Sequence, residues 1–357
     1  MTKNQRKSVG QQEWPEAATP GSRLGGGGYL LKRILGHGGY TQVWLARDVR
    51  AEREVALKIL PRGFPWEPQL LERLDEEIRR SALLAHPGIA RVYELVCDHQ
   101  VAAVATEYVD GWPLAAVRGD RPGKRFGRED ITLWVHQVSA ALEYAHHGFC
   151  LVHRCLQPAN LLLNRREQLK VTDFGIDYAV NRLAAEHGKP GAGIDAYTSP
   201  QQIQGAEASV LDDIYALGAT IFDLVTGTPP FHQGELREQI LNAPPPTMTQ
   251  RLRELNADES IDPAWEETVA ACLAKEPGRR PQSANDVIGG LESNGKRQSA
   301  AASPRSRKGT RNGLAEAKNY VAGKVPKVVS KVQALLAARK SPSREKGDDS
   351  RDRLGDA

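Results

Sequence analysis

The spacing of hydrophobic and polar positions changes twice along the chain. From Tyr29 onward, short apolar or alternating runs are separated by turn residues, which is the pattern of β-strands. We expect strands over residues 30–35, 41–47, 54–60, 89–96 and 101–109. Between the third and fourth of these, residues 68–85 place apolar side chains near helical spacing opposite charged ones, which predicts one helix.

After Asp110 the pattern becomes helical. Residues 131–145 carry an apolar stripe at i, i+3, i+4 and i+7. Residues 214–225 and 265–274 have the composition of buried helices, and the three prolines at 244–246 separate them. The whole pattern predicts an α+β architecture with two lobes, in which a small antiparallel sheet lobe precedes a larger helical lobe.

Composition excludes several classes of protein. The chain has 357 residues, of which 40% are hydrophobic, enough for one large core or two small ones. Its four cysteines lack paired CxxC spacing, and its first residues have no apolar signal-peptide core. No apolar stretch approaches the roughly 20 residues that span a bilayer. We therefore expect a cytoplasmic protein with no transmembrane segment, and we leave peripheral membrane association open.

The two ends of the chain differ from its middle. Residues 1–28 are polar and end in four glycines, so we expect a flexible leader. Residues 293–357 contain 16 lysines and arginines against six acidic residues, which the total net charge of +4 conceals. We expect residues 292–357 to be a largely disordered basic tail with an amphipathic helix over 326–339, where apolar residues repeat at 4-3 spacing.

Three interpretations of the basic tail remain open. It is a solvated linker, it attaches to an anionic membrane surface, or it binds an acidic partner. Nucleic acid is disfavoured as a partner, because the tail contains a single aromatic residue, Tyr320.

A glycine-rich hairpin and a buried lysine are the first candidates for chemistry. The segment 36–43 (GHGGYTQV) lies between two predicted strands, and glycines there allow backbone amides to approach phosphates. Such hairpins are common, so the segment alone is a weak signal. Lys58 closes the strand Val55-Ala56-Leu57-Lys58, and among apolar neighbours it needs an anionic partner to stay charged.

Further motifs follow in a fixed order and extend the pattern to residue 291. They are Glu77 nine residues before His86, then Val152-His153-Arg154, Asn160, Asp173-Phe174-Gly175, Ser199-Pro200, Asp213 and Arg280-Pro281. Taken together, the chain resembles the eukaryotic-type (Hanks-type) serine/threonine protein kinases over about residues 29–291. The resemblance implies an N-lobe at 29–106, a hinge at 107–111 and a C-lobe at 112–291. Each motif alone has an ordinary structural explanation, but one nucleotide site explains them all.

The resemblance assigns roles to individual residues around ATP and Mg²⁺. Lys58 holds the α and β phosphates and pairs with Glu77, while Asn160 and Asp173 are the metal ligands. The residues expected to bind the nucleotide are Gly36, Gly38, Val43, Ala56, Lys58, Thr106, Glu107, Val109 and Leu162. Among these, Val43, Ala56 and Leu162 enclose the adenine, Thr106 lies behind it, and Glu107 and Val109 offer backbone groups to its edge.

The catalytic loop departs from the family at two positions. Active members read His-Arg-Asp-Leu-Lys-Pro-x-Asn, whereas residues 153–160 read HRCLQPAN. Cys155 replaces the aspartate that takes the acceptor's proton, and Gln157 replaces the lysine that stabilises the migrating phosphoryl group. A thiol is mostly neutral at pH 7 and accepts hydrogen bonds poorly. Whether a nearby acid, Asp177 or Asp195, replaces the missing base is left open.

The segment after Asp173 also departs from the family. Ile194 stands where the family has a threonine that bonds the catalytic aspartate, and Gln201 replaces the glutamate that pairs with Arg280. No serine or threonine lies between Gly175 and Tyr197 to take an activating phosphate.

These departures lie on the acceptor side, whereas the nucleotide side is intact. The sequence therefore predicts a domain that binds ATP and Mg²⁺ with impaired or absent phosphotransfer and acts in signalling as a switch or scaffold, in contact with a protein partner or substrate. Two alternatives remain. One is an active serine/threonine kinase with an unusual catalytic loop, because much of phosphoryl transfer is positioning and charge neutralisation. The other is an interaction module that binds no nucleotide.

Overall fold

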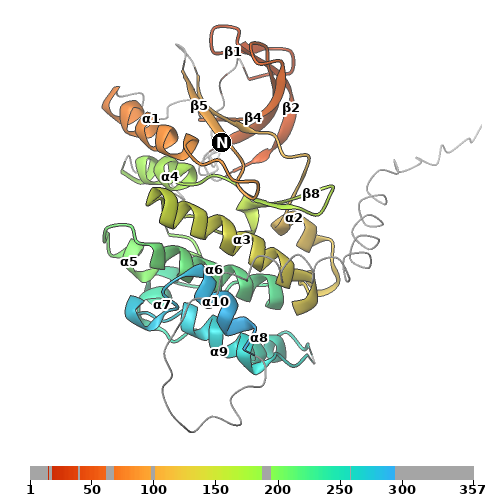
Figure 1. The fold of residues 1–357 in the computed structure, drawn as a ribbon, viewed down its shortest axis with the longest axis vertical. Helices are drawn as coiled ribbons and strands as arrows, with labels where there is room; N and C mark the ends of the chain where they lie inside the picture. The colour runs from red at the N-terminus through yellow and green to blue at the C-terminus, as the bar shows by residue number, and fades with distance from the viewer. Residues whose placement is uncertain are drawn as a thin grey trace, which may run out of the picture. The chain divides into compact units, whose positions relative to one another are not determined.

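The computed structural model describes residues 15, 18–38, 41–61, 68–97, 101–186, 194–257 and 259–293. Most of the expected leader, and the basic tail with its expected helix at 326–339, lie outside these residues. Strands dominate the first part of the described chain and helices dominate from residue 114 onward (Figure 1). The protein thus has the two-lobed α+β fold that the hydrophobic pattern predicts.

The sheet of the first lobe has six strands in the order β1-β2-β3-β4-β6-β5, and neighbouring strands are antiparallel. The strands are β1 (Arg23–Leu24), β2 (Tyr29–His37), β3 (Gln42–Asp48), β4 (Arg53–Ile59), β5 (Val92–Cys97) and β6 (Ala102–Glu107). In β4, Val55, Leu57 and Ile59 are fully buried in the core of this lobe. Since side chains alternate along a strand, Ala56 and Lys58 lie on the opposite face.

Two expected boundaries shift in the structure. Arg23–Leu24 pairs with β2 and Leu24 is buried, so the ordered sheet begins within the segment expected to be a flexible leader. The glycines at 25–27 all have positive φ, and they form the tight turn that joins β1 to β2. The strand expected to start at residue 89 begins at Val92, and Ile89 makes an isolated bridge to Val171 instead.

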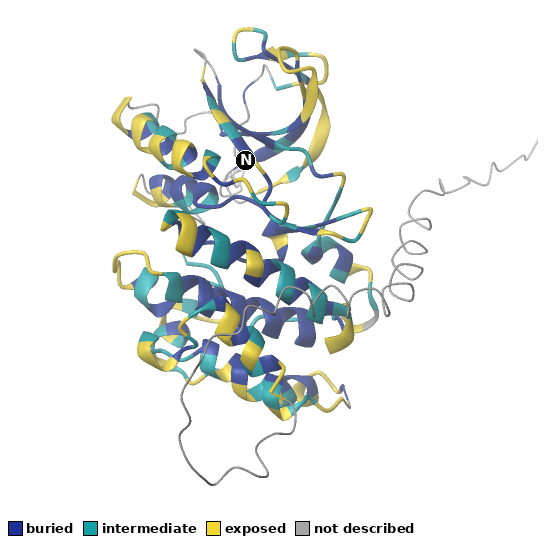
Figure 2. Ribbon diagram, in the orientation of Figure 1, coloured by how far each residue is buried: buried dark blue, intermediate teal, exposed yellow. Residues whose placement is uncertain are grey.

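Ten α-helices and three 3₁₀ turns are described. They are α1 (Pro68–Ala82), α2 (Leu114–Gly119), α3 (Arg128–Phe149), α4 (Ile176–Glu186), α5 (Pro200–Ile203), α6 (Val210–Thr226), α7 (Leu236–Asn242), α8 (Met248–Glu254), α9 (Pro263–Cys272), α10 (Ala284–Leu291), η1 (Pro122–Lys124), η2 (Pro158–Asn160) and η3 (Pro277–Arg279). α6 is buried almost along its whole length, as Figure 2 shows, and with α3 and α9 it forms the centre of the helical lobe.

A small second sheet brings the expected metal ligands together. It has the strand order β7-β8-β9, with β7 (Gly111–Pro113), β8 (Leu161–Asn164) and β9 (Leu169–Val171). Asn160 precedes β8 and Asp173 follows β9 by two residues. Leu161 pairs with Val171, and the amide of Thr172 donates to the carbonyl oxygen of Asn160 at 2.9 Å. The hairpin therefore fixes Asn160 and Asp173 near each other, at the two ends of its strands.

Helix α4 directly follows Asp173-Phe174-Gly175 and packs against α1 (Figure 1). Its buried side is apolar, and it shares one core cluster with Leu70, Leu74 and Ile78 of α1. Burial of apolar surface thus holds α4 against the first lobe. Among the described residues, none of the helices has the length and hydropathy needed to cross a bilayer.

Candidate nucleotide-binding and catalytic site

Lys58 is the charged centre of the candidate site. It is only 7% exposed, and its ammonium lies 2.6 Å from Asp173 Oδ2 and 3.0 Å from Asp177 Oδ1. Burial alone lowers the pKa of Lys58, but the two carboxylates outweigh it and raise that pKa above its ordinary value. The lysine is therefore a fixed positive charge, as a phosphate-binding residue needs to be.

The expected ion pair between Lys58 and Glu77 is absent from this structure, and this prediction is wrong for the conformation described. The Glu77 carboxylate instead lies 3.6 Å from Arg154 Nη1 and 3.7 Å from Arg80 Nη1. The physical reason is α4, because its packing against α1 brings Asp177 to the lysine in place of Glu77. Lys58 and Glu77 both remain next to Asp173-Phe174-Gly175, but with different partners.

Asn160 and Asp173, the residues expected to hold the metal ion, are linked through Asp177 and Lys58. Asp173 Oδ2 accepts from Lys58 and from the Thr172 hydroxyl at 2.8 Å. Asn160 Nδ2 donates to the Cys155 carbonyl at 2.9 Å and to Asp177 Oδ2 at 3.1 Å, so its amide oxygen is the atom with the chemistry of a magnesium ligand. Burial raises the pKa of Asp173, and the neighbouring Lys58 opposes this rise.

These donors fit a nucleotide-bound magnesium ion. One carboxylate and one amide oxygen suit Mg²⁺, which takes few protein ligands and completes its shell with phosphate oxygens and water. Within the described part of the chain, no cluster of three or more His, Cys, Asp or Glu side chains has the geometry of a metal site. Nucleotide phosphates would supply further ligands to such an ion.

The residues expected around the adenine lie on strands of both sheets. Ala56 pairs with Thr106 across β4 and β6, and the Thr106 hydroxyl donates to the Ala56 carbonyl at 3.3 Å. Val43 pairs with Lys58 across β3 and β4, and Leu162 pairs with Pro113 in the second sheet. Glu107 and Val109, which are also expected to bind the nucleotide, lie at the end of β6 and two residues beyond it.

The hinge and the glycine loop have contacts of their own. The carboxylate of Glu107 pairs with Lys170 at 2.7 Å and accepts from the amide of Arg91 at 3.1 Å. Gly38 donates to the Thr41 carbonyl at 2.7 Å, and a Cβ on Gly38 would meet the Thr41 hydroxyl at 2.6 Å. A larger residue at position 38 would therefore require the Thr41 side chain to move. Gly36 lies in β2 opposite Val43.

Cys155 is buried in the catalytic loop. Gln157 Nε2 donates to the Cys155 sulfur at 3.6 Å. The backbone amide of Cys155 donates to His153 Nδ1 at 3.2 Å. Burial raises the pKa of the thiol well above its ordinary value, and the carboxylates of Asp195 and Asp177 raise it further. The thiol is therefore protonated at neutral pH. A group in this state cannot take a proton from an acceptor hydroxyl.

A buried carboxylate, that of Asp213, fixes the backbone of the catalytic loop. It accepts from the amide of His153 at 2.7 Å, from the amide of Arg154 at 2.8 Å and from His146 Nε2 at 2.7 Å. His146 was not singled out by sequence reasoning, because on an apolar helix face it is indistinguishable from a core histidine. Arg154 has a φ of 68°, a strained value for a residue with a side chain, and such strain is found at functional sites.

The two acids considered as replacement bases have different positions. Asp177 contacts Lys58 and Asn160 on the nucleotide side. Asp195 Oδ1 accepts from the amide of Tyr197 and from the hydroxyl of Thr198, both at 2.9 Å. Burial raises the pKa of Asp195, and these hydrogen bonds oppose the rise. Asp195 lies near enough to Cys155 for its charge to raise the pKa of the thiol.

The segment that follows is anchored by polar contacts. Gln201 Oε1 accepts from Arg280 Nη2 at 2.6 Å, which is the neutral counterpart of the family's ion pair. Tyr197 donates to the buried carboxylate of Asp223 at 2.7 Å, and Arg118 pairs with the same carboxylate. Ile194 packs against the core of the helical lobe instead of making a polar contact to the catalytic loop.

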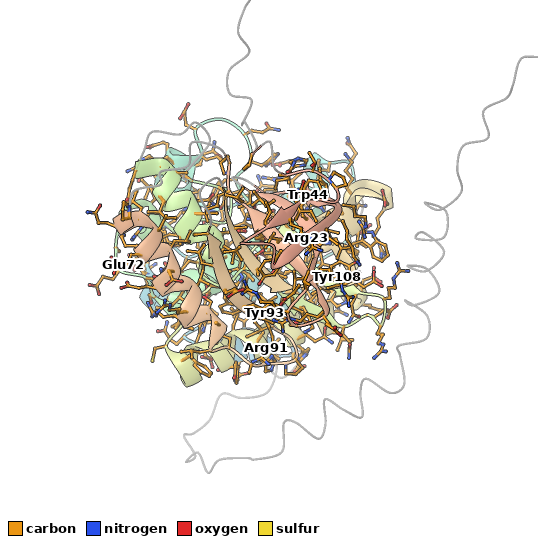
Figure 3. All side chains as sticks on the ribbon, turned by 90° about the horizontal axis from the view of Figure 1, so that it is seen from above. Arg23, Trp44, Glu72, Arg91, Tyr93 and Tyr108 are labelled. Atoms are coloured by element: carbon orange, nitrogen blue, oxygen red, sulfur yellow. The ribbon has the colours of Figure 1, made fainter. Side chains whose placement is uncertain are left out.

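A separate hollow of about 530 Å³ lies on the first lobe. Its lining residues include Tyr29, Arg53, Arg91 and Tyr93. Figure 3 labels Arg91 and Tyr93. Arg53 stacks on the ring of Tyr93 at 3.6 Å from its centroid. None of the residues expected to bind the nucleotide lines this hollow, so it is distinct from the candidate site.

Comparison with known proteins assigns the chain to a family. The family model described as "Protein kinase domain" matches residues 29–288. Serine/threonine-protein kinase PrkC of Bacillus subtilis is 32% identical over 267 residues, covering 75% of this chain and 40% of PrkC. Serine/threonine-protein kinase PknA of Mycobacterium tuberculosis is 34% identical over 265 residues, covering 72% of this chain and 59% of PknA. This chain thus spans about half the length of these relatives.

A solved structure gives the same assignment of fold. The crystal structure of the Mycobacterium tuberculosis PknI kinase domain superposes with a TM-score of 0.62 at 25% sequence identity, covering 77% of this chain and 98% of that one. The chain therefore belongs to the protein kinase family and, within it, to the Hanks-type serine/threonine kinases.

Proposed function

We propose that this kinase domain binds ATP with Mg²⁺ between its lobes, transfers phosphate slowly or not at all, and acts in signalling as a switch or scaffold. The observation that carries the proposal is a contrast within one site. Lys58, Asp173 and Asn160 retain the nucleotide-side chemistry, whereas the protonated, buried thiol of Cys155 occupies the position of the catalytic aspartate.

Each residue has a role in this proposal. Lys58 binds the α and β phosphates, and Asp173 and Asn160 hold the metal ion, which neutralises negative charge on the phosphate oxygens when it is bound. Gly36 and Gly38 let the backbone approach the phosphates, and Val43, Ala56 and Leu162 enclose the base. Cys155 orients the acceptor hydroxyl poorly, and Gln157 brings no charge to the migrating phosphoryl group.

An active serine/threonine kinase is the second candidate. It is favoured by the kinase names of the similar proteins and by the retained nucleotide residues. Positioning and charge neutralisation supply a large part of the barrier reduction in phosphoryl transfer, and these do not need the base. Interaction of the basic tail with an anionic membrane surface or an acidic partner is a separate proposal that concerns residues outside those described.

Nucleotide binding and phosphotransfer are measured on the same full-length protein. We expect Mg²⁺ and ATP to raise the thermal stability of the wild type, by about 2.7 kcal/mol at a hundredfold excess over Kd. The Lys58→Met variant should show a much smaller shift. Transfer from radiolabelled ATP to protein by the wild type should stay close to that of Lys58→Met. If ATP and Mg²⁺ do not change the thermal stability of the wild type, the proposed nucleotide binding is refuted. If the wild type transfers phosphate rapidly and Lys58→Met abolishes the transfer, the proposed loss of phosphotransfer is refuted.

A further inference from the structure

Asp177 contacts both Lys58 and Asn160, the residues expected to bind the phosphates and the metal ion of a nucleotide. It lies in the first turn of α4, two residues after Gly175. Its Oδ1 is 3.0 Å from Lys58 Nζ, and its Oδ2 is 3.1 Å from Asn160 Nδ2. One carboxylate thus spans the phosphate-binding cation and the amide expected at the metal.

A carboxylate in this place resembles a phosphate group in its chemistry. Both present anionic oxygens that accept hydrogen bonds from an ammonium group, and such charge-assisted bonds are the strong ones. Lys58 already has Asp173 as a partner, so Asp177 gives the cation a second negative neighbour. Incoming phosphate oxygens would be attracted by Lys58 but repelled by both carboxylates, in a buried place where water screens charge weakly.

The position of Asp177 is set by packing. α4 buries Ile176, Ala179, Val180 and Leu183 in a cluster with apolar residues of α1. The far end of α4 is tied to α1 by the ion pair of Glu186 with Arg73, at 3.2 Å. Figure 1 shows the two helices side by side at the edge of the first lobe.

The turn before α4 is anchored as well. The Ser81 hydroxyl, on α1, donates to the carbonyl of Phe174 at 2.7 Å, in a buried position. Arg154 holds Glu77 at 3.6 Å and lies over the ring of Tyr178, with its guanidinium carbon 5.2 Å from the centroid. These contacts keep Asp177 next to Lys58 and keep Glu77 away from it.

We propose that Asp177 is a residue that determines ligand specificity, acting as an internal competitor of nucleotide phosphates for Lys58. A phosphate-bearing nucleotide must displace the carboxylate, whereas adenosine has no phosphate and leaves the contact in place. Asp177 therefore lowers the affinity for ADP and ATP without lowering the affinity for adenosine. This inference rests on the proposed nucleotide-binding function.

The test compares three ligands on four forms of the full chain. Isothermal titration with adenosine, ADP and ATP is carried out on the wild type and on Asp177→Ala, Asp177→Asn and Glu186→Ala. ADP is also titrated in EDTA, which isolates the phosphate contact at Lys58 from the metal. Glu186→Ala is the matched control, because it removes an acidic residue of α4 and weakens the pairing with α1 without touching Lys58.

We expect Asp177→Ala to bind ADP and ATP about tenfold more tightly than the wild type, which corresponds to about 1.4 kcal/mol. Its affinity for adenosine should change less than twofold, which also shows that the variant is folded. Asp177→Asn should give a smaller gain, because a neutral amide oxygen still accepts from Lys58 but brings no charge. Glu186→Ala should behave as the wild type with all three ligands.

Three results overturn the inference. Equal ADP affinity in the wild type and Asp177→Ala shows that the carboxylate does not compete. Weaker ADP binding in Asp177→Ala shows that Asp177 assists the ligand. An equal gain in Glu186→Ala shows that loosening α4, and not freeing Lys58, is responsible. If none of the four forms binds any of the three ligands, the proposed nucleotide-binding function itself fails, which is a distinct result.

Discussion

Arg154 and Glu77 form an ion pair, with Nη1 of the arginine 3.6 Å from Oε1 of the glutamate. The family resemblance instead pairs Glu77 with Lys58, and Asp177 holds that lysine in the structure. Lys58 thus has the α4 carboxylate of Asp177 beside it where the resemblance leads us to expect Glu77. The structure describes the arrangement in which α4 supplies the partner.

This arrangement predicts that Lys58 contributes more than Glu77 to the free energy of unfolding. Glu77→Ala removes a partly exposed pair and should lower the free energy of unfolding by no more than about 1 kcal/mol. Lys58→Met leaves the buried Asp173 without its cation and should cost about 3 kcal/mol or more. Urea unfolding in the absence of nucleotide measures both. Equal costs would indicate that the Lys58–Glu77 pair forms in solution.

The buried Asp223 gives a second prediction about stability. Its carboxylate is 0% exposed and is bound by Arg118 and by the hydroxyl of Tyr197. Arg118→Ala should destabilise the fold by about 3–5 kcal/mol, because it leaves a buried charge without its partner. Tyr197→Phe removes one hydrogen bond and should cost about 1 kcal/mol.

A surface pair serves as the control for this series. Arg128 pairs with Asp262 and its side chain is 43% exposed, so Arg128→Ala should cost less than about 1 kcal/mol. Chemical denaturation of the four proteins ranks the effects. A cost for Arg118→Ala as small as that for Arg128→Ala would contradict the buried environment of Asp223.

The four cysteines should separate into two classes in thiol labelling. Cys97 and Cys150 are exposed, whereas Cys155 and Cys272 are buried. Burial raises the pKa of Cys272 to about 12 and that of Cys155 well above its ordinary value. Since the thiolate is the reactive form, two thiols should react quickly with iodoacetamide at pH 8 and two only after unfolding.

Mass spectrometry of peptides identifies which cysteines are labelled. The denatured protein, in which all four sites react, provides the reference. Labelling of Cys155 in the native protein at the rate of Cys150 would contradict the protonated thiol on which the proposed function depends.

Lys275 predicts a specific dependence of stability on pH. Burial, with help from the nearby Arg280, lowers the pKa of Lys275 to about 8. Between about pH 8 and 10.5 the unfolded chain then binds more protons than the folded one, so the contribution of Lys275 to stability rises with pH in this interval. Relative to Lys275→Met, the wild type should gain stability as the pH is raised. Parallel curves for the two proteins would show that Lys275 has an ordinary pKa.

Much of the fold could be predicted from periodicity. The apolar run at 54–60 predicts a strand, and β4 forms there with Val55, Leu57 and Ile59 buried. Strand β1 was missed, because two residues before four glycines give no periodic signal, and its formation depends on pairing with β2. Asn160 and Asp173 could be assigned from motifs, and the β8–β9 hairpin brings them together.

The partner of Lys58 could not be predicted from the sequence. Glu77 and Asp177 are both carboxylates, and sequence spacing does not show which of them lies beside the ammonium group of Lys58. The choice depends on the packing of α4 against α1, which joins residues about 100 positions apart. The sequence did contain one signal for Asp177 as a partner of Lys58. It is an acidic side chain in the first turn of a helix whose buried residues are all apolar.

We propose that the acceptor side of the site limits phosphotransfer while the nucleotide side remains competent. The most direct measurement is transfer of labelled γ-phosphate to protein at saturating ATP and Mg²⁺ by the wild type, by Lys58→Met and by the double variant Cys155→Asp/Gln157→Lys. We predict that the wild type stays near the Lys58→Met background and that the double variant transfers at least about 10²-fold faster. Wild-type turnover at about 1–100 s⁻¹, or a double variant no faster than the wild type, would contradict the claim.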